Sequence, residues 1–324
     1  MKKITVIGFG TWGTALASLL DRNGHSVTIW SKFPTGGSRA CPFLKGFVLP
    51  DSIKLTESVE EAASVADMYV VAVPSNAVRD AISEFSPFYK QGQIIANGGK
   101  GFEEGTLKRL SQVAAEVAPM CRVVVISGPC HAEELVQGMP SAYVAAADDL
   151  ETAKEVQDVF MNPAFRVYVN DDVAGVEIGG ALKNVIALAA GCSDGLGYGD
   201  NAKAALMTRG IAEIARLGVA MGAKSETFAG LAGLGDLIVT CTSMHSRNRR
   251  AGILLGQGVS LDDTLNEIQA VVEGVGTTKT AYELSQKYNV EMPIVAEMYK
   301  FIFEGKPGRE AVNDLMRRDK TAEG

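Results

Sequence analysis

The sequence predicts an α/β protein in which an N-terminal, doubly wound parallel sheet is followed by an all-helical domain. Two observations predict this class. In the first half, short apolar runs rich in β-branched residues alternate with runs of helical periodicity, as in a parallel sheet covered by helices. After Asn170 the β-branched runs nearly vanish, and long stretches of Ala, Leu, Ile and Gly replace them. We therefore expect one domain over residues 1–170 and a second over residues 171–324.

Each predicted element follows from its hydrophobic period. The predicted strands span residues 4–7, 26–30, 68–73, 93–96, 123–127, 143–146 and 165–169. The helices predicted in the first domain span residues 14–22, 76–85, 106–117, 132–137 and 150–160. Those predicted in the second domain span residues 173–190, 201–221, 261–269, 276–287 and 294–303. The Ala-rich helices of the second domain can fill its core or form the interface of a homodimer, and the sequence leaves both open.

Composition narrows the class of protein. Hydrophobic residues make up 47% of the 324 residues and charged residues 21%, which is ordinary for a globular protein. The net charge is −7 and no basic tail is present. Nucleic acid is therefore not expected as a partner, because binding to a phosphate backbone needs a positive surface. Any anionic ligand must be held by a local cluster of Lys and Arg.

The cysteines and histidines show no metal-binding pattern. The five cysteines contain no C-x-x-C pair, and the three histidines (His25, His131 and His245) are too scattered to suggest a site. This usage predicts a reduced, cytoplasmic protein without a structural metal.

Two apolar segments imitate targeting or membrane sequences. Residues 2–20 have the charge and hydrophobicity of a signal peptide, but their glycine spacing has another meaning. Residues 173–191 carry Glu177 and Lys183 near the middle, which makes a poor membrane span. We expect neither secretion nor membrane insertion.

Gly8, Gly10 and Gly13 form a G-x-G-x-x-G motif between the first strand and the first helix. The glycines allow a tight turn, close approach of a pyrophosphate and contact between helix and strand. The N-terminus of the helix then offers free N–H groups to the anion. In this context the motif predicts a Rossmann-type dinucleotide site.

The second strand ends in Ser31 and Lys32, with Arg39 further on, where an NAD-specific site usually has Asp or Glu. A cation there can meet the 2′-phosphate of NADP. We therefore expect NADPH to be accepted, while the alternative is that Lys32 is a solvated loop residue.

Lys183 lies in an apolar helix that would bury it. A desolvated lysine has a lowered pKa and can exchange protons near neutral pH, as the reduction of a ketone requires. The alternatives are that it extends to solvent or pairs with Glu177.

Other clusters strengthen the first interpretation. Small residues surround Asp236 and Thr240, and the basic run from Ser246 to Arg250 can bind a phosphate, although such runs are often solvated faces. Lys100 lies between glycines after a strand, at the edge where doubly wound sheets bind ligands. Cys130 follows another strand and is interpreted as lining a pocket or capping a helix rather than as a reactive thiol.

Taken together, the segments GFGTWGTALA from Gly8, KG from Lys100, SGP from Ser127, EIGGALKN from Glu177 and GLAGLGDL from Gly230 resemble bacterial NAD(P)-dependent glycerol-3-phosphate dehydrogenases. GDN from Gly199 and SRNR from Ser246 extend the resemblance over nearly the whole chain. It implies a Rossmann domain followed by a helical domain like the C-terminal domain of 6-phosphogluconate dehydrogenase. It also implies that Lys183 donates and accepts the proton.

With the residues derived above, the resemblance yields two sets of expected contacts. The expected substrate-binding residues are Lys100, Gly128, Cys130, Lys183, Asp236, Thr240, Ser246, Arg247 and Asn248. The expected contacts to NADPH or NADH are Gly8, Gly10, Thr11, Trp12, Gly13, Lys32, Lys100, Ala132, Arg247, Val271 and Glu273.

The sequence departs from the family pattern in two places. Position 130 is usually Ser or Thr, so Cys130 loses a hydroxyl contact. The segment 31–43 is shorter than usual, and we expect the helix after the second strand to be missing.

The resemblance implies reversible reduction of dihydroxyacetone phosphate, a small three-carbon phosphate, to sn-glycerol 3-phosphate for glycerophospholipid synthesis. A β-hydroxyacid dehydrogenase of the 6-phosphogluconate type would instead use carboxylate substrates. A non-catalytic NAD(P)H sensor would bind cofactor without turnover.

Overall fold

The structure is a computed structural model that describes residues 1–41, 44, 46–320 and 322. Its strands are β1 (Lys3–Ile7), β2 (Ser26–Trp30), β3 (Lys54–Thr56), β4 (Met68–Val71), β5 (Ile94–Asn97), β6 (Arg122–Ser127), β7 (Ser141–Ala146) and β8 (Phe165–Asn170). The helices between the strands are α1 (Thr11–Arg22), α2 (Val59–Ser64), α3 (Val78–Glu84), α4 (Leu110–Val117), α5 (Ala132–Val136) and α6 (Leu150–Phe160), with short helices η1 (Ser75–Ala77) and η2 (Ser86–Phe88).

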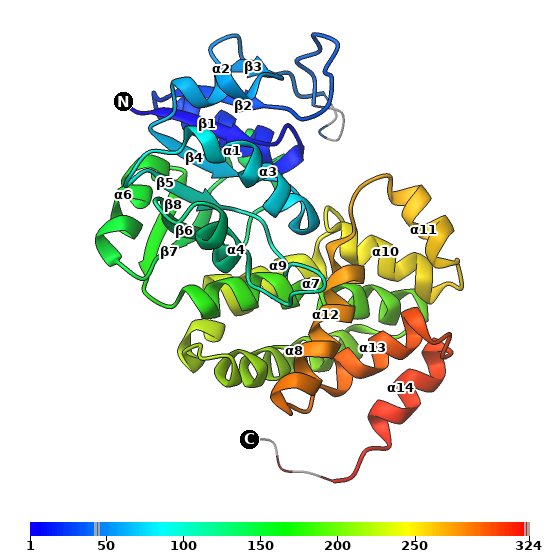
Figure 1. Ribbon diagram of the computed structural model, residues 1–324. Coiled ribbons are helices and arrows are strands. Elements are labelled where there is room, and N and C mark those ends of the chain that lie inside the picture. Colours follow the sequence, from blue (N-terminus) through cyan, green and yellow to red (C-terminus); the bar gives the residue numbers. More distant parts are fainter. Residues whose placement is uncertain (42–43, 45, 321, 323–324) are drawn as a thin grey trace.

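The second half of the described chain is helical. Its helices are α7 (Val173–Gly195), α8 (Asp200–Ala220), η3 (Ser225–Ala229), η4 (Leu231–Gly235), α9 (Asp236–Thr242), α10 (Arg247–Gly256), α11 (Leu261–Ile268), α12 (Glu273–Tyr288), α13 (Pro293–Phe303) and α14 (Gly308–Met316). Figure 1 shows the sheet and its helices above and the helical part below, with α7 along the boundary between them. The α/β class with a helical second half is therefore confirmed.

The eight strands form one sheet in the order β3-β2-β1-β4-β5-β6-β7-β8. All neighbours are parallel except β6 and β7, which are antiparallel. The expectation of a fully parallel sheet is therefore wrong at this edge. The reason is the length of α5, whose five residues rise only about 7.5 Å. A return along the six residues of β6 would need about 20 Å, so the chain stays at the carboxyl edge and enters β7 in the opposite direction.

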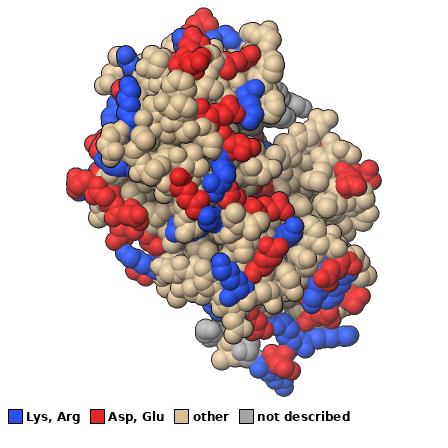
Figure 2. Space-filling model, in the orientation of Figure 1, with Lys and Arg blue, Asp and Glu red and all other residues tan. Residues whose placement is uncertain are grey.

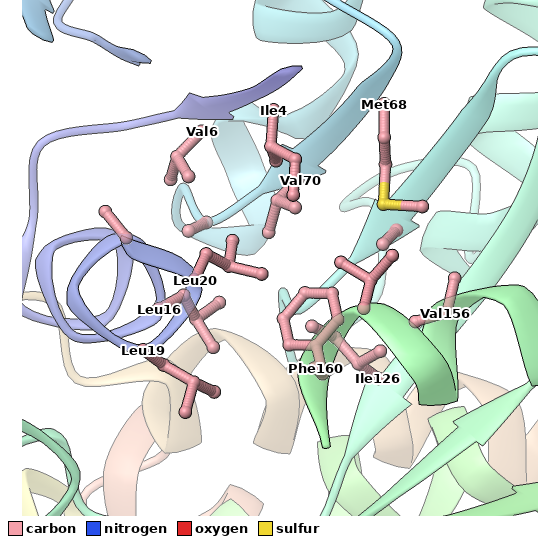
Figure 3. Close-up of a cluster of buried hydrophobic side chains, with 14 of the residues drawn as sticks. Ile4, Val6, Leu16, Leu19, Leu20, Met68, Val70, Ile126, Val156 and Phe160 are labelled. Carbon is pink, nitrogen blue, oxygen red and sulfur yellow. The ribbon is translucent and has the colours of Figure 1, made fainter. Parts of the chain in front are cut away.

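Apolar clusters cover both faces of the sheet. On one face α1 and α6 pack against the central strands, and Figure 3 shows Leu16 and Leu20 of α1 near Val6 and Val70, with Phe160 of α6 close by. On the other face α2, α3 and α4 pack against strands β1, β4 and β5. Helices on both faces make the sheet doubly wound, as the alternating pattern predicted.

The core of the helical part is built around α7. Its residues are buried continuously from Gly175 to Ser193. Near its C-terminus α7 packs on α10 at backbone distance: a Cβ added at Gly191 would lie 2.1 Å from the carbonyl oxygen of Arg249, and one at Gly252 would lie 2.1 Å from that of Leu188. The small residues of α7 thus fill the core.

Within the described residues, α7 is also the helix with the length and hydropathy to cross a membrane. In its most apolar window, 89% of the residues are buried inside the protein. Its apolar surface is therefore already covered by neighbouring helices.

Several elements differ from the sequence prediction. The predicted helix over residues 106–117 begins only at Leu110, because Leu107 has a φ of 60° and the chain turns there. The short elements β3, α2, α9, α10 and α14 were not predicted. Among the described residues between β2 and β3 no helix occurs, as expected from the short 31–43 segment.

Candidate active site

Five predicted site residues meet where the sheet faces the helical part. Lys100 follows β5 and Gly128 follows β6, so both lie beyond the carboxyl edge of the sheet. Lys183 lies in the middle of α7, while Asp236 begins α9 and Thr240 follows one turn later. Residues from both halves of the chain therefore form one cluster, which we call the lysine–aspartate cluster.

Asp236 is the centre of the lysine–aspartate cluster. Its Oδ2 accepts a hydrogen bond from Lys100 Nζ at 2.6 Å, and its Oδ1 accepts one from Lys183 Nζ. Lys100 also donates to the carbonyl oxygen of Gly128 at 3.1 Å, and Lys183 donates to Thr240 Oγ1 at 2.8 Å. Lys183 therefore pairs with Asp236, and the predicted alternative of a Glu177 partner is wrong.

Glu177 has other partners. It accepts hydrogen bonds from the backbone and hydroxyl of Ser111 and from Arg109 Nη1 at 2.8 Å. This buried carboxylate ties α7 to the start of α4. Because Glu177 lies about two helical turns before Lys183, these bonds also help to fix the position of Lys183 relative to the sheet.

Burial and charge set the protonation of the cluster. Burial lowers the pKa of Lys183 to about 8; Asp236 raises this pKa and Lys100 lowers it. Burial would raise the pKa of Asp236, but the charges of Lys100 and Lys183 outweigh it and hold the pKa below its usual value. At neutral pH the carboxylate is charged, and Lys183 can gain or lose a proton.

Aromatic rings lie next to Lys100. Its Nζ is 5.6 Å from the ring centroid of Tyr143, and Tyr143 contacts Trp12 with centroids 5.7 Å apart. Tyr143 was not among the predicted site residues, because it reads as an ordinary buried residue of a strand. The contact brings Trp12 of α1 to the same place as Lys100.

The N-terminus of α1 has the shape of a pyrophosphate site. Gly8 has a φ of 116°, and a Cβ added at Gly13 would lie 2.0 Å from the carbonyl oxygen of Gly8, so neither position accepts a side chain. Around Gly10 a Cβ would meet nothing within 4 Å, and no side chain caps the helix. The open approach and the free N–H groups fit a dinucleotide.

The three arginines at the start of α10 lie in two different environments. Arg249 is paired with Asp194 at 2.8 Å, and Arg250 is exposed. Arg247 is exposed and makes no hydrogen bond or ion pair within the described part of the chain, although its charge acts on Glu273. Arg247 is therefore an arginine of this run whose guanidinium is free and whose charge reaches the predicted site residue Glu273.

Ser246 and Asn248 hold the backbone around Arg247. Ser246 caps α10 by accepting from the backbone N–H of Arg249 at 3.2 Å. Asn248 donates to Asn184 Oδ1 at 2.9 Å and accepts from the backbone N–H of Gly274 at 2.8 Å. Asn184, directly after Lys183, was missed as a member of this network.

Two family models match the chain. The model described as the NAD-dependent glycerol-3-phosphate dehydrogenase N-terminus matches residues 3–153, and that of the C-terminus matches residues 172–313. The chain belongs to this dehydrogenase family. The resemblance seen in the sequence motifs is confirmed.

Relatives of this dehydrogenase family match over their full length. The glycerol-3-phosphate dehydrogenase (NAD(P)+) of Fusobacterium nucleatum is 52% identical over 332 residues, covering 100% of this chain and 99% of the relative. That of Moorella thermoacetica is 52% identical over 330 residues, covering 99% and 98%. The crystal structure of glycerol-3-phosphate dehydrogenase from Coxiella burnetii superposes with a TM-score of 0.94 at 36% identity, covering 98% of this chain and 99% of that one.

Three further positions expected at the cofactor lie outside the glycine turn. Ala132 begins α5, Val271 is 44% exposed before α12, and Glu273 begins α12. Glu273 accepts hydrogen bonds from the backbone of Ser75 at 3.1 Å and from its hydroxyl at 2.6 Å. This bond joins the helical part to the sheet, and burial raises the pKa of Glu273.

Both cations predicted to meet the 2′-phosphate, Lys32 and Arg39, have partners within the protein. Lys32 forms an ion pair with Glu84 at 2.7 Å. Arg39 donates to backbone carbonyl oxygens, including that of Ile53 at 2.8 Å. Of these two residues, Lys32 is the one that lies at the surface beside the end of β2, whereas Arg39 is bound to backbone oxygens.

Cys130 lies beside the cluster without a strong polar contact. Its Sγ donates weakly to the carbonyl oxygen of His131 at 3.9 Å, and burial raises the thiol pKa to about 12. A thiol with this pKa is not a nucleophile at neutral pH. The raised thiol pKa agrees with the non-reactive interpretation, while a substrate contact at Cys130 stays a prediction.

Two of the histidines that are scattered along the sequence lie next to each other in the structure. The rings of His131 and His245 lie 5.5 Å apart between centroids. They are more than one hundred positions apart in the sequence, so no spacing rule could have joined them. The fold does so because the loop after β6 meets the connection between α9 and α10.

Proposed function

We propose that the chain catalyses the reversible reduction of dihydroxyacetone phosphate to sn-glycerol 3-phosphate with NADH or NADPH. The observation that carries this proposal is the buried ammonium group of Lys183, held by Asp236 and Thr240 at the edge of a dinucleotide-binding sheet. The relatives named glycerol-3-phosphate dehydrogenase (NAD(P)+) support the same reaction. Its product supplies glycerophospholipid synthesis.

The first half of the chain holds the cofactor in this proposal. The free N–H groups at the start of α1, with the open surface at Gly10, bind the pyrophosphate. Trp12 and Lys100 border the nicotinamide end of the cofactor. Both contact the ring of Tyr143, which brings them to the same place. When bound, NAD(P)H supplies the hydride that the substrate carbon receives.

Lys183 moves the proton. In reduction its ammonium group donates a proton to the C2 oxygen of the ketone, and in oxidation the neutral amine accepts the proton of the C2 hydroxyl. A pKa of about 8, lowered by burial, makes both forms accessible near neutral pH. Asp236 and Thr240 orient the amine by accepting its hydrogen bonds.

Lys100 places a positive charge next to the C2 oxygen of the substrate. Its ammonium group is anchored on Asp236 and on the carbonyl of Gly128, so it needs little reorganisation during the reaction. A preorganised cation stabilises the negative charge that develops on the C2 oxygen. The negative charge of Asp236 offsets the repulsion between the two ammonium groups.

Arg247 holds the phosphate end of the substrate. A guanidinium group binds phosphate with two parallel hydrogen bonds, and the start of α10 adds backbone N–H groups. Ser246 and Asn248 act by fixing this backbone through the bonds to Arg249 and Gly274. Figure 2 shows positive and negative side chains interspersed over one face of the molecule, so no broad basic surface is visible there.

Three further features complete the proposal. Residues 1–170 form the cofactor domain and residues 171–324 the substrate domain, with Asp172 capping α7 at the junction. The enzyme works in the cytoplasm without membrane insertion, which agrees with the free state of its five cysteines. A homodimer would use surfaces other than the buried face of α7.

The decisive test is oxidation of NADH and of NADPH followed by absorbance, with dihydroxyacetone phosphate as substrate. Rapid oxidation that depends on this ketone supports the proposal. Turnover only with carboxylate substrates would identify a β-hydroxyacid dehydrogenase. Binding of NADH without turnover of any substrate would identify a sensor.

A further inference from the structure

Two histidines outside the assigned machinery face each other across the domain junction. His131 is the N-cap residue of α5, on the loop that carries Gly128 and Cys130. His245 lies between α9 and α10, directly before Ser246. Their ring centroids are 5.5 Å apart with an angle of 52° between the planes. The pair thus connects the Cys130 side of the site with the start of α10.

The Nε2 atom of His131 is buried and has no hydrogen-bond partner within the described part of the chain. A buried polar nitrogen without a partner is unfavourable, and most such groups in folded proteins are satisfied. Its position beside two residues expected to contact substrate makes a bound ligand a natural partner.

The charged neighbours determine which ligand group suits this nitrogen. Burial lowers the pKa of His131 and the charge of Lys183 lowers it too, while Glu133 and Glu134 oppose this and His245 adds to it. The ring is therefore neutral near pH 7. One nitrogen of a neutral imidazole donates a hydrogen bond, and the donor suits an anionic oxygen.

We propose that His131 is a further substrate-binding residue, whose Nε2–H donates to a phosphate oxygen of the substrate. His245 holds the His131 ring from the α10 side, where Ser246 and Arg247 begin the helix. Because Cys130 offers no hydroxyl, His131 supplies the hydrogen bond on this loop. The inference rests on the proposed function, since it adds a contact to the same phosphate.

The test compares two substitutions of one residue. His131→Phe keeps the ring and removes the donor, whereas His131→Gln places an amide N–H near the position of Nε2. For the Phe variant we expect KM for dihydroxyacetone phosphate to rise about 10-fold with kcat within about twofold, as for a lost contact to a charged group. The Gln variant should recover most of this loss, and KM for NADH should stay unchanged in both. As the control, His25→Phe changes a histidine that contacts Lys2 and Val159 instead, and it should change KM by less than about twofold.

A second readout needs no turnover. Inorganic phosphate added to the enzyme with NADH should shift the NMR resonance of the His131 imidazole nitrogen and leave that of His25 unchanged. An unchanged KM in His131→Phe, or equal losses in the Phe and Gln variants, would overturn the proposal. So would an unshifted His131 resonance at saturating phosphate. Failure of the proposed function is distinguishable, because the wild-type enzyme would then not turn over dihydroxyacetone phosphate.

Discussion

Lys183 and Asp236 are 53 positions apart in the chain and form an ion pair whose side chains are only 8% and 1% exposed. Lys100, 17% exposed, binds the other oxygen of the same carboxylate. Removing one member of a buried pair leaves an uncompensated charge, which is strongly unfavourable. Asp236 therefore contributes both to the chemistry of the site and to the stability of the fold.

Replacing Lys183 should abolish proton transfer. For Lys183→Met we expect kcat with dihydroxyacetone phosphate to fall by about 100-fold to 10,000-fold, the usual contribution of a general acid or base. Lys183→Arg should fall similarly, because a guanidinium group stays protonated. Steady-state NADH oxidation measures the loss, and quenching of Trp fluorescence by NADH checks that both variants still bind cofactor. Near-normal turnover in either variant would remove Lys183 from the mechanism.

The two directions of the reaction should respond oppositely to pH. Reduction uses protonated Lys183, so its kcat/KM should fall as the pH rises through about 8, whereas oxidation uses the neutral amine and should gain activity over the same range. Asp236→Asn removes the charge that raises this pKa and leaves Lys100 in place, so both transitions should move to lower pH. Profiles of kcat/KM in both directions test this. Parallel profiles, or a shift to higher pH in the variant, would contradict the assignment.

Arg247 and Arg250 offer a matched pair for the phosphate site. Both are exposed arginines of α10, and of the two it is the charge of Arg247 that acts on Glu273. Arg247→Ala should raise KM for dihydroxyacetone phosphate by about 10-fold to 100-fold, as expected for lost hydrogen bonds to a charged group. Arg250→Ala should leave KM unchanged. Equal effects of both substitutions would show that general surface charge, not a specific contact, attracts the substrate.

Lys32 should affect NADPH more than NADH. Because its partner Glu84 competes with the 2′-phosphate, Lys32→Ala should raise KM for NADPH about threefold to fivefold, the small effect typical of an exposed ion pair. Glu84→Gln frees the ammonium group and should lower KM for NADPH. KM for NADH, which has no 2′-phosphate, is the internal control. If Lys32→Ala changed both constants equally, the lysine would be a solvated loop residue.

Glu213 of α8 should make stability depend on pH. Its carboxylate accepts the backbone N–H groups of Ile294 at 2.8 Å and Val295 at 3.3 Å, and burial raises its pKa from 4.5 to about 7. The folded state therefore keeps this proton to a higher pH than the unfolded state. The resulting stabilisation is complete below the unfolded pKa and is lost as the pH rises to about 7, a change of about 3 kcal/mol.

Glu213→Gln removes this titration. In urea unfolding, the stability of the wild type relative to this variant should fall between about pH 4.5 and about pH 7. Asp262→Asn, an exposed change in α11, serves as the control. A constant difference between wild type and Glu213→Gln would show that Glu213 titrates alike in both states.

The local pattern of apolar and polar residues was sufficient to predict most elements in the first half of the chain. The turn at Gly8 and Gly13 could be predicted because the motif and its strand–turn–helix context are adjacent in sequence. The direction of β7 could not, because it depends on how far the short helix α5 carries the chain. Lys183 was identified as a candidate because it lies within a long apolar run, while its burial was decided by the helices that pack around α7.

The sequence by itself determined the fold class, the dinucleotide motif and the apolar surroundings of Lys183, since these depend on local period and composition. The tertiary structure decided the partners: Asp236 rather than Glu177 for Lys183, Asp194 for Arg249, and His245 for His131. Such pairings arise between elements far apart in the chain. They depend on the distance and angle at which helices pack, and no sequence period encodes those quantities.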